Sequence, residues 1–427
     1  KMIPRCRQHK IAVALSGGID SSVVAYLLQK IPNTSVIALH MTNWSSRDED
    51  NQPLGCVEQD MKDAEAVCQH LSIPLKKTSF ESEYWTEVFT PYLDGISKGL
   101  SLNPDVACNA VVKFGVMKEY AMKHLGVDSI ATGHYARLWN GLRDEATEDV
   151  ELVREEHRWI QQWISDDIPL LLKAVDATKD QSYFLSGVQG KDFRNVIFPL
   201  GDRIKSRTAI SQKTVRELAR EAKLPNASKR ESMGICFIGK RRFESFISQY
   251  LPPSQPGNFV DVDTGKIIGN HNGALLYTLG QGAKLSGAPH KYFVTGRDDK
   301  NTLYICQGTH HPALYSKQMK LHSIVWLGGS LPQPLKEGKR LSLTCRVRHL
   351  QPLFSCELEL CDNSYIVYFH CPVRAVTPGQ TAAFYLGAIC LGGGIISERG
   401  PSYHDLKLEL PTNIHPASQN DRSVTSW

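Results

Sequence analysis

The chain has 427 residues, 41% of them hydrophobic and 22% charged, with a formal net charge of +5 at pH 7. This length exceeds what one hydrophobic core usually supports, and the composition is that of a globular protein, so we expect two or three domains. No apolar run approaches the ~20 residues that cross a bilayer, which argues against a membrane partner. The mild positive charge is compatible with nucleic acid as a partner without requiring it.

The 11 cysteines are scattered and include no C-x-x-C pair. Neither a zinc ribbon nor a dense disulfide framework is indicated, so cysteine spacing predicts no tightly bound metal. A reducing compartment fits this cysteine usage best. The chain opens at Lys1-Met2 without a secretory signal, and the sequence leaves open whether an organelle-targeting peptide was removed.

The first predicted elements are a strand and a helix joined by a glycine turn. Residues 11–15 are consecutive apolar residues, which is typical of a strand buried on both faces. The run ends at Ser16-Gly17-Gly18, and a helical pattern follows with apolar residues at Val23, Val24, Leu27 and Leu28. This geometry points free backbone N–H groups at one spot and favours phosphate binding. The turn lacks the lysine of a Walker loop.

The string that follows the strand resembles the pyrophosphate loop of N-type ATP pyrophosphatases. These enzymes cleave ATP between the α and β phosphates and activate a carbonyl oxygen as its adenylate. The resemblance implies that Mg²⁺ lies near Asp20 and that the ATP-binding residues here are Ala14, Leu15, Ser16, Gly17, Gly18, Ile19, Asp20 and Ser21. The alternative is an ordinary strand–turn–helix corner whose glycines serve close packing.

Further strands and helices alternate over the first ~200 residues, which predicts a parallel sheet with helices on both faces. We expect strands at 35–41, 71–75 and 129–131, and helices at 61–70, 84–93 and 113–125. The aromatic residues of 84–93 are interpreted as a core-facing stripe rather than a binding platform. Ligands bind beyond the carboxyl ends of parallel strands, where Ser16, Met41 and Gly133 fall.

The pattern changes in the second half of the chain. We interpret residues 141–174, which are rich in Asp and Glu, as a partly helical surface insertion, and expect either an amphipathic helix pair or a single long helix from 206 to 223. A hairpin is predicted at 258–269. Short alternating strands at 341–347, 356–360, 365–369 and 381–385 then indicate a small β-barrel.

Two cysteines differ from the others in their surroundings. Cys108 follows Asn103-Pro104-Asp105, a string that favours a turn, so we expect its thiol on a loop. Cys236 is followed by Lys240-Arg241-Arg242, and positive charge favours a thiolate. From local sequence alone, Cys108 and Cys236 can each also be interpreted as a small buried hydrophobic residue without a reactive thiol.

Several motifs occur in a fixed order and together resemble the tRNA-specific 2-thiouridylase family. The motifs are Ser16-Gly-Gly-Ile-Asp-Ser, Met41-Thr-Asn-Trp, Asn103-Pro-Asp-Val-Ala-Cys-Asn, Ala131-Thr-Gly-His-Tyr, Lys179-Asp-Gln-Ser-Tyr-Phe-Leu, Gly234-Ile-Cys-Phe-Ile-Gly, Thr278-Leu-Gly-Gln and Leu391-Gly-Gly-Gly. The resemblance spans about residues 10–397. It implies an N-terminal parallel-sheet ATP-pyrophosphatase domain (1–238), a small mostly-β central domain (239–312) and a C-terminal β-barrel (313–400), followed by a tail (401–427).

The resemblance implies ATP-dependent transfer of sulfur to C2 of the wobble uridine of tRNA. Cys236 would carry a persulfide received from a donor protein, and Cys108 would be its catalytic partner. The product would be a Cys108–Cys236 disulfide that a reductant must reset. Asp105 is the implied acid or base, and its alternative role is to cap the turn.

Binding residues carry over from the same resemblance. Asn103, Pro104 and Asp105 should contact the target base, while Met41 and Gly133 should line the adenine and ribose pocket. The implied tRNA contacts are Lys179, Asp180, Gln181, Arg348 and His349. Alternating arginines on a strand otherwise indicate a solvated face.

The chain departs from the family pattern at three places. Ala110 stands where a lysine commonly follows Cys-Asn, and no arginine–lysine pair follows Gln281. The acidic insertion at 141–174 is longer than in bacterial members. We expect a mitochondrial enzyme, with the bacterial cytoplasm as the alternative location. The alternative functions are another ATP-pyrophosphatase synthetase acting on a small carbonyl substrate, or a tRNA-binding protein without catalysis.

Overall fold

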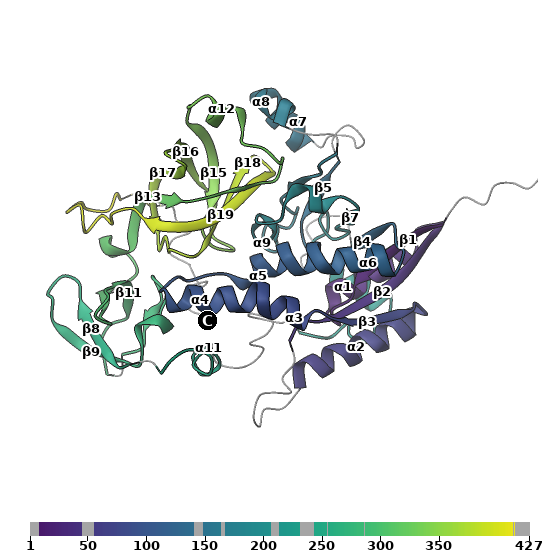
Figure 1. Cartoon of the computed structure of the whole chain (residues 1–427), viewed down its shortest axis with the longest axis horizontal. Coiled ribbons are helices and arrows are strands. Elements are labelled where there is room, and N and C mark those ends of the chain that lie inside the picture. Colours follow the sequence, from purple (N-terminus) through teal and green to yellow (C-terminus); the bar gives the residue numbers. More distant parts are fainter. Residues whose placement is uncertain are drawn as a thin grey trace, which may run out of the picture.

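The computed structural model describes residues 8–44, 55–140, 148–163, 167–205, 213–230, 243–253, 255–285, 287–412 and 414. Three sheets organise these residues, one in each part of the molecule (Figure 1). They are a parallel sheet near the N-terminus, a small central sheet and a C-terminal barrel. The predicted fold class is therefore confirmed. No helix in the described ranges is both long and apolar enough to span a bilayer.

The N-terminal sheet has the order β3-β2-β1-β4-β7, and every neighbouring pair is parallel. Its strands are β1 (His9–Ala14), β2 (Thr34–Thr42), β3 (Leu75–Ser79), β4 (Ser129–Ala131) and β7 (Val196–Ile197). Strand β1 lies in the middle, which explains why Ile11, Ala12 and Val13 are all buried. The carboxyl ends of β1, β2 and β4 therefore meet at one edge.

Helices α1 (Ile19–Gln29), α2 (Gly55–Leu71) and α6 (Lys118–His124) pack against this sheet. Further helices of this part are α3 (Glu81–Tyr84), α4 (Thr90–Ser97), α9 (Ser182–Leu185) and α10 (Val215–Glu221), and a π-helix, Trp85–Phe89, joins α3 to α4. The strand predicted at 71–75 is wrong in position. Ser72 has a φ of 53° and the Ile73 N–H donates to the Cys68 carbonyl oxygen, so this segment caps α2, and β3 begins only at Leu75.

The segment with the first candidate cysteine is a helix, so the expected loop around Cys108 is also wrong. The Asn103 side chain accepts a 3.1 Å hydrogen bond from the Asp105 N–H, and Pro104 occupies the first helical position. An Asn cap followed by Pro is a helix-start signal as well as a turn signal. Helix α5 (Pro104–Ala107) continues into a π-helix, Cys108–Met117, and then into α6.

The central sheet has the order β10-β11-β12-β8-β9. Its strands are β8 (Gly257–Asp261), β9 (Ile267–His271), β10 (Gly282–Ala283), β11 (Tyr292–Arg297) and β12 (Leu303–Gln307), and helix α11 (Phe243–Ile247) precedes it. Strands β8 and β9 form the predicted hairpin, with Asp261 accepting hydrogen bonds from the turn residues Asp263 and Thr264.

The barrel is closed because β13 pairs with both β17 and β19. Its strands are β13 (Tyr315–Leu321), β15 (Leu341–Arg346), β16 (Phe354–Cys361), β17 (Ser364–Arg374), β18 (Thr381–Leu386) and β19 (Ile389–Arg399); β14 (Val325–Trp326) pairs with β19, and α12 (Gln333–Lys336) precedes β15. The predicted barrel strands are all present.

Two strands from the N-terminal half extend the barrel sheet. Strand β6 (Leu170–Leu172) pairs with β19, and β5 (Arg137–Trp139) pairs with β6. The segment 141–174 is therefore not wholly a surface insertion: α7 (Glu148–Glu156) and α8 (Trp159–Trp163) are its helices, but Leu170–Leu172 is fully buried.

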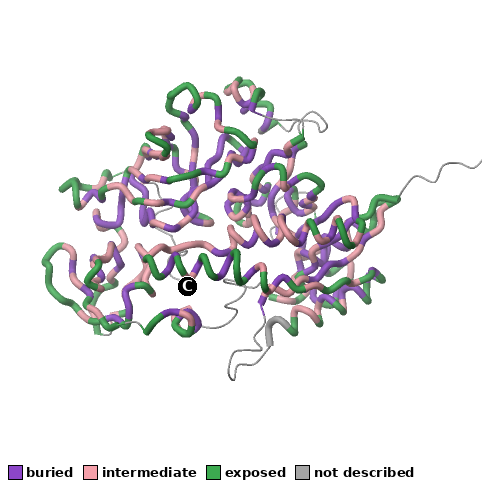
Figure 2. Tube along the Cα trace, viewed as in Figure 1, coloured by how far each residue is buried: buried purple, intermediate pink, exposed green. Residues whose placement is uncertain are grey.

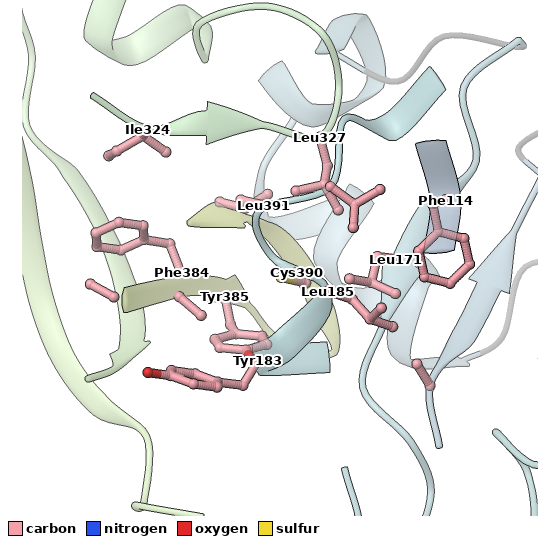
Figure 3. Packing of buried hydrophobic residues seen from close by; sticks show 14 of the residues in the cluster. Phe114, Leu171, Tyr183, Leu185, Ile324, Leu327, Phe384, Tyr385, Cys390 and Leu391 are labelled. Carbon is pink, nitrogen blue, oxygen red and sulfur yellow. The ribbon is translucent and has the colours of Figure 1, made fainter. Parts of the chain in front are cut away.

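One hydrophobic core joins the N-terminal part to the barrel. Leu171 and Leu185 lie beside Leu391 and Tyr385 in this core (Figure 3), and Figure 2 shows buried segments in both parts. The Tyr183 hydroxyl donates to the Thr381 carbonyl oxygen across the same junction. The two parts are therefore held in a fixed relation.

Candidate active site

A cavity of about 390 Å³ opens at the carboxyl ends of β1, β2 and β4. It brings together residues predicted for ATP binding and for catalysis. The predicted residues that line it are Ala14, Leu15, Ser16, Asp20, Ser21, Met41, Asp105, Cys108, Gly133 and Gln181. Those that do not line it are Gly17, Gly18, Ile19, Asn103, Pro104, Lys179, Asp180, Arg348 and His349.

The glycine turn connects β1 to α1 and keeps backbone donors available. The N–H groups of Ile19, Asp20 and Ser21 make no hydrogen bond to any described residue, as expected for the first turn of a helix. Gly17 has a φ of 81°, and a Cβ there would lie 2.1 Å from the Asp60 carbonyl oxygen. The turn is therefore shaped to accept an anion and tolerates no side chain at Gly17.

Two residues more than 200 positions later in the chain contact the backbone of the turn. Asn226 Nδ2 donates 2.9 Å hydrogen bonds to the Gly17 carbonyl oxygen and to Ser22 Oγ. Lys229 Nζ donates to the same Gly17 oxygen at 3.1 Å and pairs with Asp60 at 2.7 Å and with Asp63. The chain just before Cys236 is thus fastened to the phosphate turn.

Asp20 is held by a buried cation. Lys205 Nζ forms an ion pair with Asp20 Oδ1, and the Tyr135 hydroxyl donates to the same oxygen at 2.9 Å. The Lys205 side chain is only 2% exposed, so the Asp20 carboxylate compensates a cation that lies away from solvent. Sequence reasoning missed Lys205, because no local pattern links an isolated lysine to a loop 185 residues earlier.

The residues beside the turn only partly match a magnesium site. Mg²⁺ is usually held by one or two carboxylates, substrate phosphates and water. Asp20 and Asp60 both line the cavity, but one oxygen of each already pairs with a lysine. Within the described ranges, no group of three or more His, Cys, Asp or Glu residues could hold a metal ion. The arrangement fits an ion bound largely through phosphate oxygens.

The opposite wall of the cavity comes from the ends of β2 and β4. His40 Nδ1 lies 2.8 Å from the Leu15 carbonyl oxygen, and burial lowers the pKa of His40. A Cβ on Gly133 would lie 3.0 Å from the Ser21 backbone nitrogen, so the glycine lets this strand end approach the first turn of α1. Met41 completes this part of the wall.

Cys108 and Asp105 lie on the same side of the cavity, one helical turn apart. Cys108 is 3% exposed, and burial raises the pKa of its thiol to about 11, with a smaller contribution from the Asp105 charge. Burial also raises the pKa of Asp105. The charge of Lys113 lowers the pKa of both groups and so opposes the effect of burial. A thiol, a carboxyl group and an ammonium group therefore share this end of the cavity.

The sequence prediction omitted several polar lining residues, among them Asn43, Lys113, Thr132 and His134. Asn43 Nδ2 lies 3.9 Å from Cys108 Sγ, and His134 Nδ1 lies 2.7 Å from Thr132 Oγ1. Burial lowers the pKa of His134 well below its usual value. Asn43 and His134 fall inside quoted motifs, whereas Lys113 follows Cys108 by five residues with no motif to mark it.

Of the two predicted tRNA contacts that follow Lys179, Gln181 lies at the cavity and Asp180 lies in the interior. Gln181 lines the cavity, and its Oε1 accepts a 3.0 Å hydrogen bond from the Tyr135 N–H. Asp180 is 1% exposed, and its carboxylate accepts from the Ala174 and Ser182 N–H groups. Asp180 is therefore an interior residue, and its predicted contact with tRNA is not supported.

Arg348 is likewise an interior residue. It is 7% exposed, and its Nη2 donates to the carbonyl oxygens of Leu279 and Ala375. Its predicted contact with tRNA is not supported, because this guanidinium group joins the central part to the barrel. The His349 ring is half-buried against Phe184, with ring centroids 4.3 Å apart. Burial, Arg346 and Lys179 lower the pKa of His349 to about 4, so its ring is neutral at pH 7.

The second candidate cysteine, Cys236, lies outside the described residues, as do Lys240, Arg241 and Arg242. The described residues on either side of it reach the site. Lys229 contacts the phosphate turn, and Phe246 of α11 packs on Trp44, a lining residue, with ring centroids 5.8 Å apart.

Comparison with protein-family models gives matches along nearly the whole chain. The model described as tRNA methyl transferase HUP domain matches residues 9–240. The tRNA methyl transferase PRC-barrel domain matches residues 244–307, and the aminomethyltransferase beta-barrel domain matches residues 316–396.

Curated relatives align over most of both chains. The chain is 39% identical over 410 residues to mitochondrial tRNA-specific 2-thiouridylase 1 of Gallus gallus, which covers 92% of each chain. It is 39% identical over 401 residues to the protein of that name from Homo sapiens, covering 93% of this chain and 92% of the other. It is 40% identical over 394 residues to tRNA-specific 2-thiouridylase MnmA of Chlamydia pneumoniae, covering 91% and 97%.

Proposed function

The chain belongs to the tRNA-specific 2-thiouridylase family, and from this premise we propose that it transfers sulfur to C2 of the wobble uridine of tRNA at the expense of ATP. The observation that carries the proposal is the shared cavity. Ser16, Asp20 and Ser21 of the phosphate turn line it together with Cys108 and Asp105. A base bound between them would meet both an activating nucleotide and a sulfur nucleophile.

The first step is activation of the base. Uridine O2 attacks the α-phosphorus of ATP, the bond to pyrophosphate breaks, and the base becomes O-adenylated. The N–H groups of Ile19, Asp20 and Ser21 are suited to hold the departing pyrophosphate. We propose Mg²⁺ as the accompanying ion; when bound, it would neutralise phosphate charge, with Asp20 as its protein ligand.

The second step replaces oxygen by sulfur. The terminal sulfur of a Cys236 persulfide attacks C2, and AMP leaves with the former O2. The Cys108 thiolate then attacks Cys236 Sγ, and the electron pair of the broken S–S bond stays on the sulfur at C2. In the other possible order, the Cys108 thiolate first attacks Cys236 Sγ of the persulfide and releases hydrosulfide, and the hydrosulfide then attacks C2. Both orders leave a Cys108–Cys236 disulfide and a 2-thiouridine.

These steps require partners besides tRNA. A donor protein must load the persulfide onto Cys236, and a reductant must return two electrons to the disulfide. We propose Asn103, Pro104 and Asp105 as contacts to the target base, and Lys179, Gln181 and His349 as contacts to the rest of the tRNA. For location we propose the mitochondrion, as in the relatives from Gallus gallus and Homo sapiens, with the bacterial cytoplasm as the alternative.

The decisive experiment incubates the protein with ATP, tRNA and a persulfide donor and measures tRNA nucleosides by mass spectrometry. Cys108→Ser and Cys236→Ser should each abolish 2-thiouridine while leaving tRNA binding nearly unchanged, and Cys68→Ser, on a buried thiol of α2, is the matched control. Wild-type thiolation in either variant would refute the two-cysteine mechanism. Pyrophosphate release that does not need tRNA would favour a small-substrate synthetase, and no release would favour a binding protein.

A further inference from the structure

We propose that Lys113 is the positioning residue for the Cys108 thiolate: its ammonium group supplies the positive charge beside the sulfur, and the Asp105 carboxylate receives the thiol proton. The inference rests on the proposed function, because it assigns a role within the sulfur-transfer step. It explains how a deeply buried thiol becomes a nucleophile.

The helix type brings the two side chains together. Cys108 and Lys113 are five residues apart on the π-helix Cys108–Met117. In an α-helix, a side chain five positions later points about 140° away. A π-helix repeats its hydrogen bonds from residue i to i+5, so the same two side chains fall on nearly one face. Accordingly, both residues line the one cavity.

Lys113 is also distinguished by charge. Among the described residues that line the cavity, it is the sole Lys or Arg. It forms no ion pair or hydrogen bond with any described residue, so no carboxylate of the described ranges neutralises it at short range.

The other titratable groups around the sulfur cannot take this role. Asp105, from α5, is an anion that disfavours the thiolate. His134, after β4, and His40, on β2, have pKa values lowered by burial, so both rings are neutral at pH 7. The remaining titratable lining groups are the carboxyl groups of Asp20 and Asp60 and the hydroxyl group of Tyr84.

The proton step balances without a further reagent. The Cys108 S–H bond breaks, its electron pair stays on sulfur, and the proton moves to a carboxylate oxygen of Asp105. One negative charge moves from oxygen to sulfur, so the total charge of the site is unchanged. Lys113 lowers the pKa of both acids, which opposes the effect of burial on Asp105 and stabilises the thiolate after the transfer.

The test measures alkylation of Cys108 by iodoacetamide as a function of pH, without ATP or tRNA. Peptide mass spectrometry separates Cys108 from the other cysteines. Lys113→Met should move the alkylation midpoint up by about one pH unit, which means a roughly tenfold lower rate below both midpoints. Lys113→Arg should restore most of the rate. Lys123→Met, on an exposed lysine of α6 that pairs with Glu119, is the matched control and should change nothing.

Two further measurements complete the experiment. Thermal unfolding should show that Lys113→Met is folded, and the first turnover of tRNA-dependent pyrophosphate release should stay near the parent rate while thiolation falls about tenfold. An unshifted alkylation profile in Lys113→Met would overturn the proposal. A loss of pyrophosphate release with normal alkylation would also overturn it, because Lys113 would then serve a phosphate group. Absence of thiolation by the parent protein would instead count against the proposed function.

Discussion

Nη2 of Arg348, just after β15, donates a 2.7 Å hydrogen bond to the carbonyl oxygen of Leu279, in the loop before β10. The same nitrogen also donates to Thr377 Oγ1 at 2.9 Å, after β17. Arg374 forms a second hydrogen bond to the same loop, because its Nη2 donates to the Gly280 carbonyl oxygen. Two buried arginines of the barrel therefore fix the position of the central part.

Replacing Arg348 with Met should destabilise the protein without removing a direct contact to a tRNA phosphate. The substitution leaves buried oxygens without donors, so we expect the free energy of unfolding to fall by about 1–3 kcal/mol. The salt dependence of tRNA binding should be unchanged, whereas loss of a phosphate contact would lower its slope by about 1. Urea unfolding and binding titrations at several salt concentrations test both parts. Arg340→Met, on an exposed arginine that pairs with Glu359, is the control.

Lys205→Met should impair the nucleotide step. The variant leaves the Asp20 carboxylate with the Tyr135 hydroxyl but without its buried counter-charge. We expect pyrophosphate release to fall at least about tenfold, equivalent to about 1.4 kcal/mol of lost transition-state stabilisation. Lys213→Met removes an exposed lysine that pairs with Glu221 and should have no effect. A parent-like rate in Lys205→Met would show that Asp20 does not need this ion pair.

Gly17→Ala should disable the phosphate turn. The added Cβ would meet the Asp60 carbonyl oxygen at 2.1 Å, and the positive φ adds strain. Gly265→Ala is the matched control, because Gly265 has a φ of 67° but nothing within 4 Å of its added Cβ. Gly265→Ala should cost about 1 kcal/mol of stability and keep full activity. If both variants retain pyrophosphate release, close packing of Gly17 on Asp60 is not required for function.

The elements that could be predicted are those whose pattern is local. Strand β1 and the barrel strands have apolar runs or alternation within a few residues, so sequence reasoning found them. Strand β6 was missed because Leu170–Leu172 is a three-residue run after an acidic stretch, and its partner is Ile389 and Cys390 at the other end of the chain. Non-local pairing of this kind leaves no periodic signal.

The residues of the candidate site also differ in whether a local sequence pattern marks them. The turn residues and Cys108 belong to quoted motifs, but Lys205 and Asn226 contribute only through tertiary contacts. The π-helix that turns Lys113 toward Cys108 also has no recognised sequence pattern. The tRNA contact at Arg348 came from the family resemblance, and neither that resemblance nor the alternation of arginines indicates that another part of the chain covers this side chain.

His349 gives a pH prediction whose sign follows from its lowered pKa. An unfolded histidine titrates near pH 6.5, whereas His349 in the folded protein has a pKa of about 4. Between these values the unfolded chain binds more protons, so stability rises with pH across this window and is lost as the pH falls from 6.5 toward 4.

His349→Phe should therefore make the protein less sensitive to acid than the parent. The phenyl ring keeps the contact with Phe184 but cannot take up a proton. Between pH 7 and pH 4 the parent should lose more unfolding free energy than His349→Phe. This extra loss should be at most about 3 kcal/mol, and screening reduces it because the ring is partly exposed. Urea unfolding at several pH values measures it, and His370→Phe, at an exposed histidine, should show no such gain. Equal acid sensitivity in His349→Phe and the parent would mean that the ring is protonated as readily in the folded protein as in the unfolded chain.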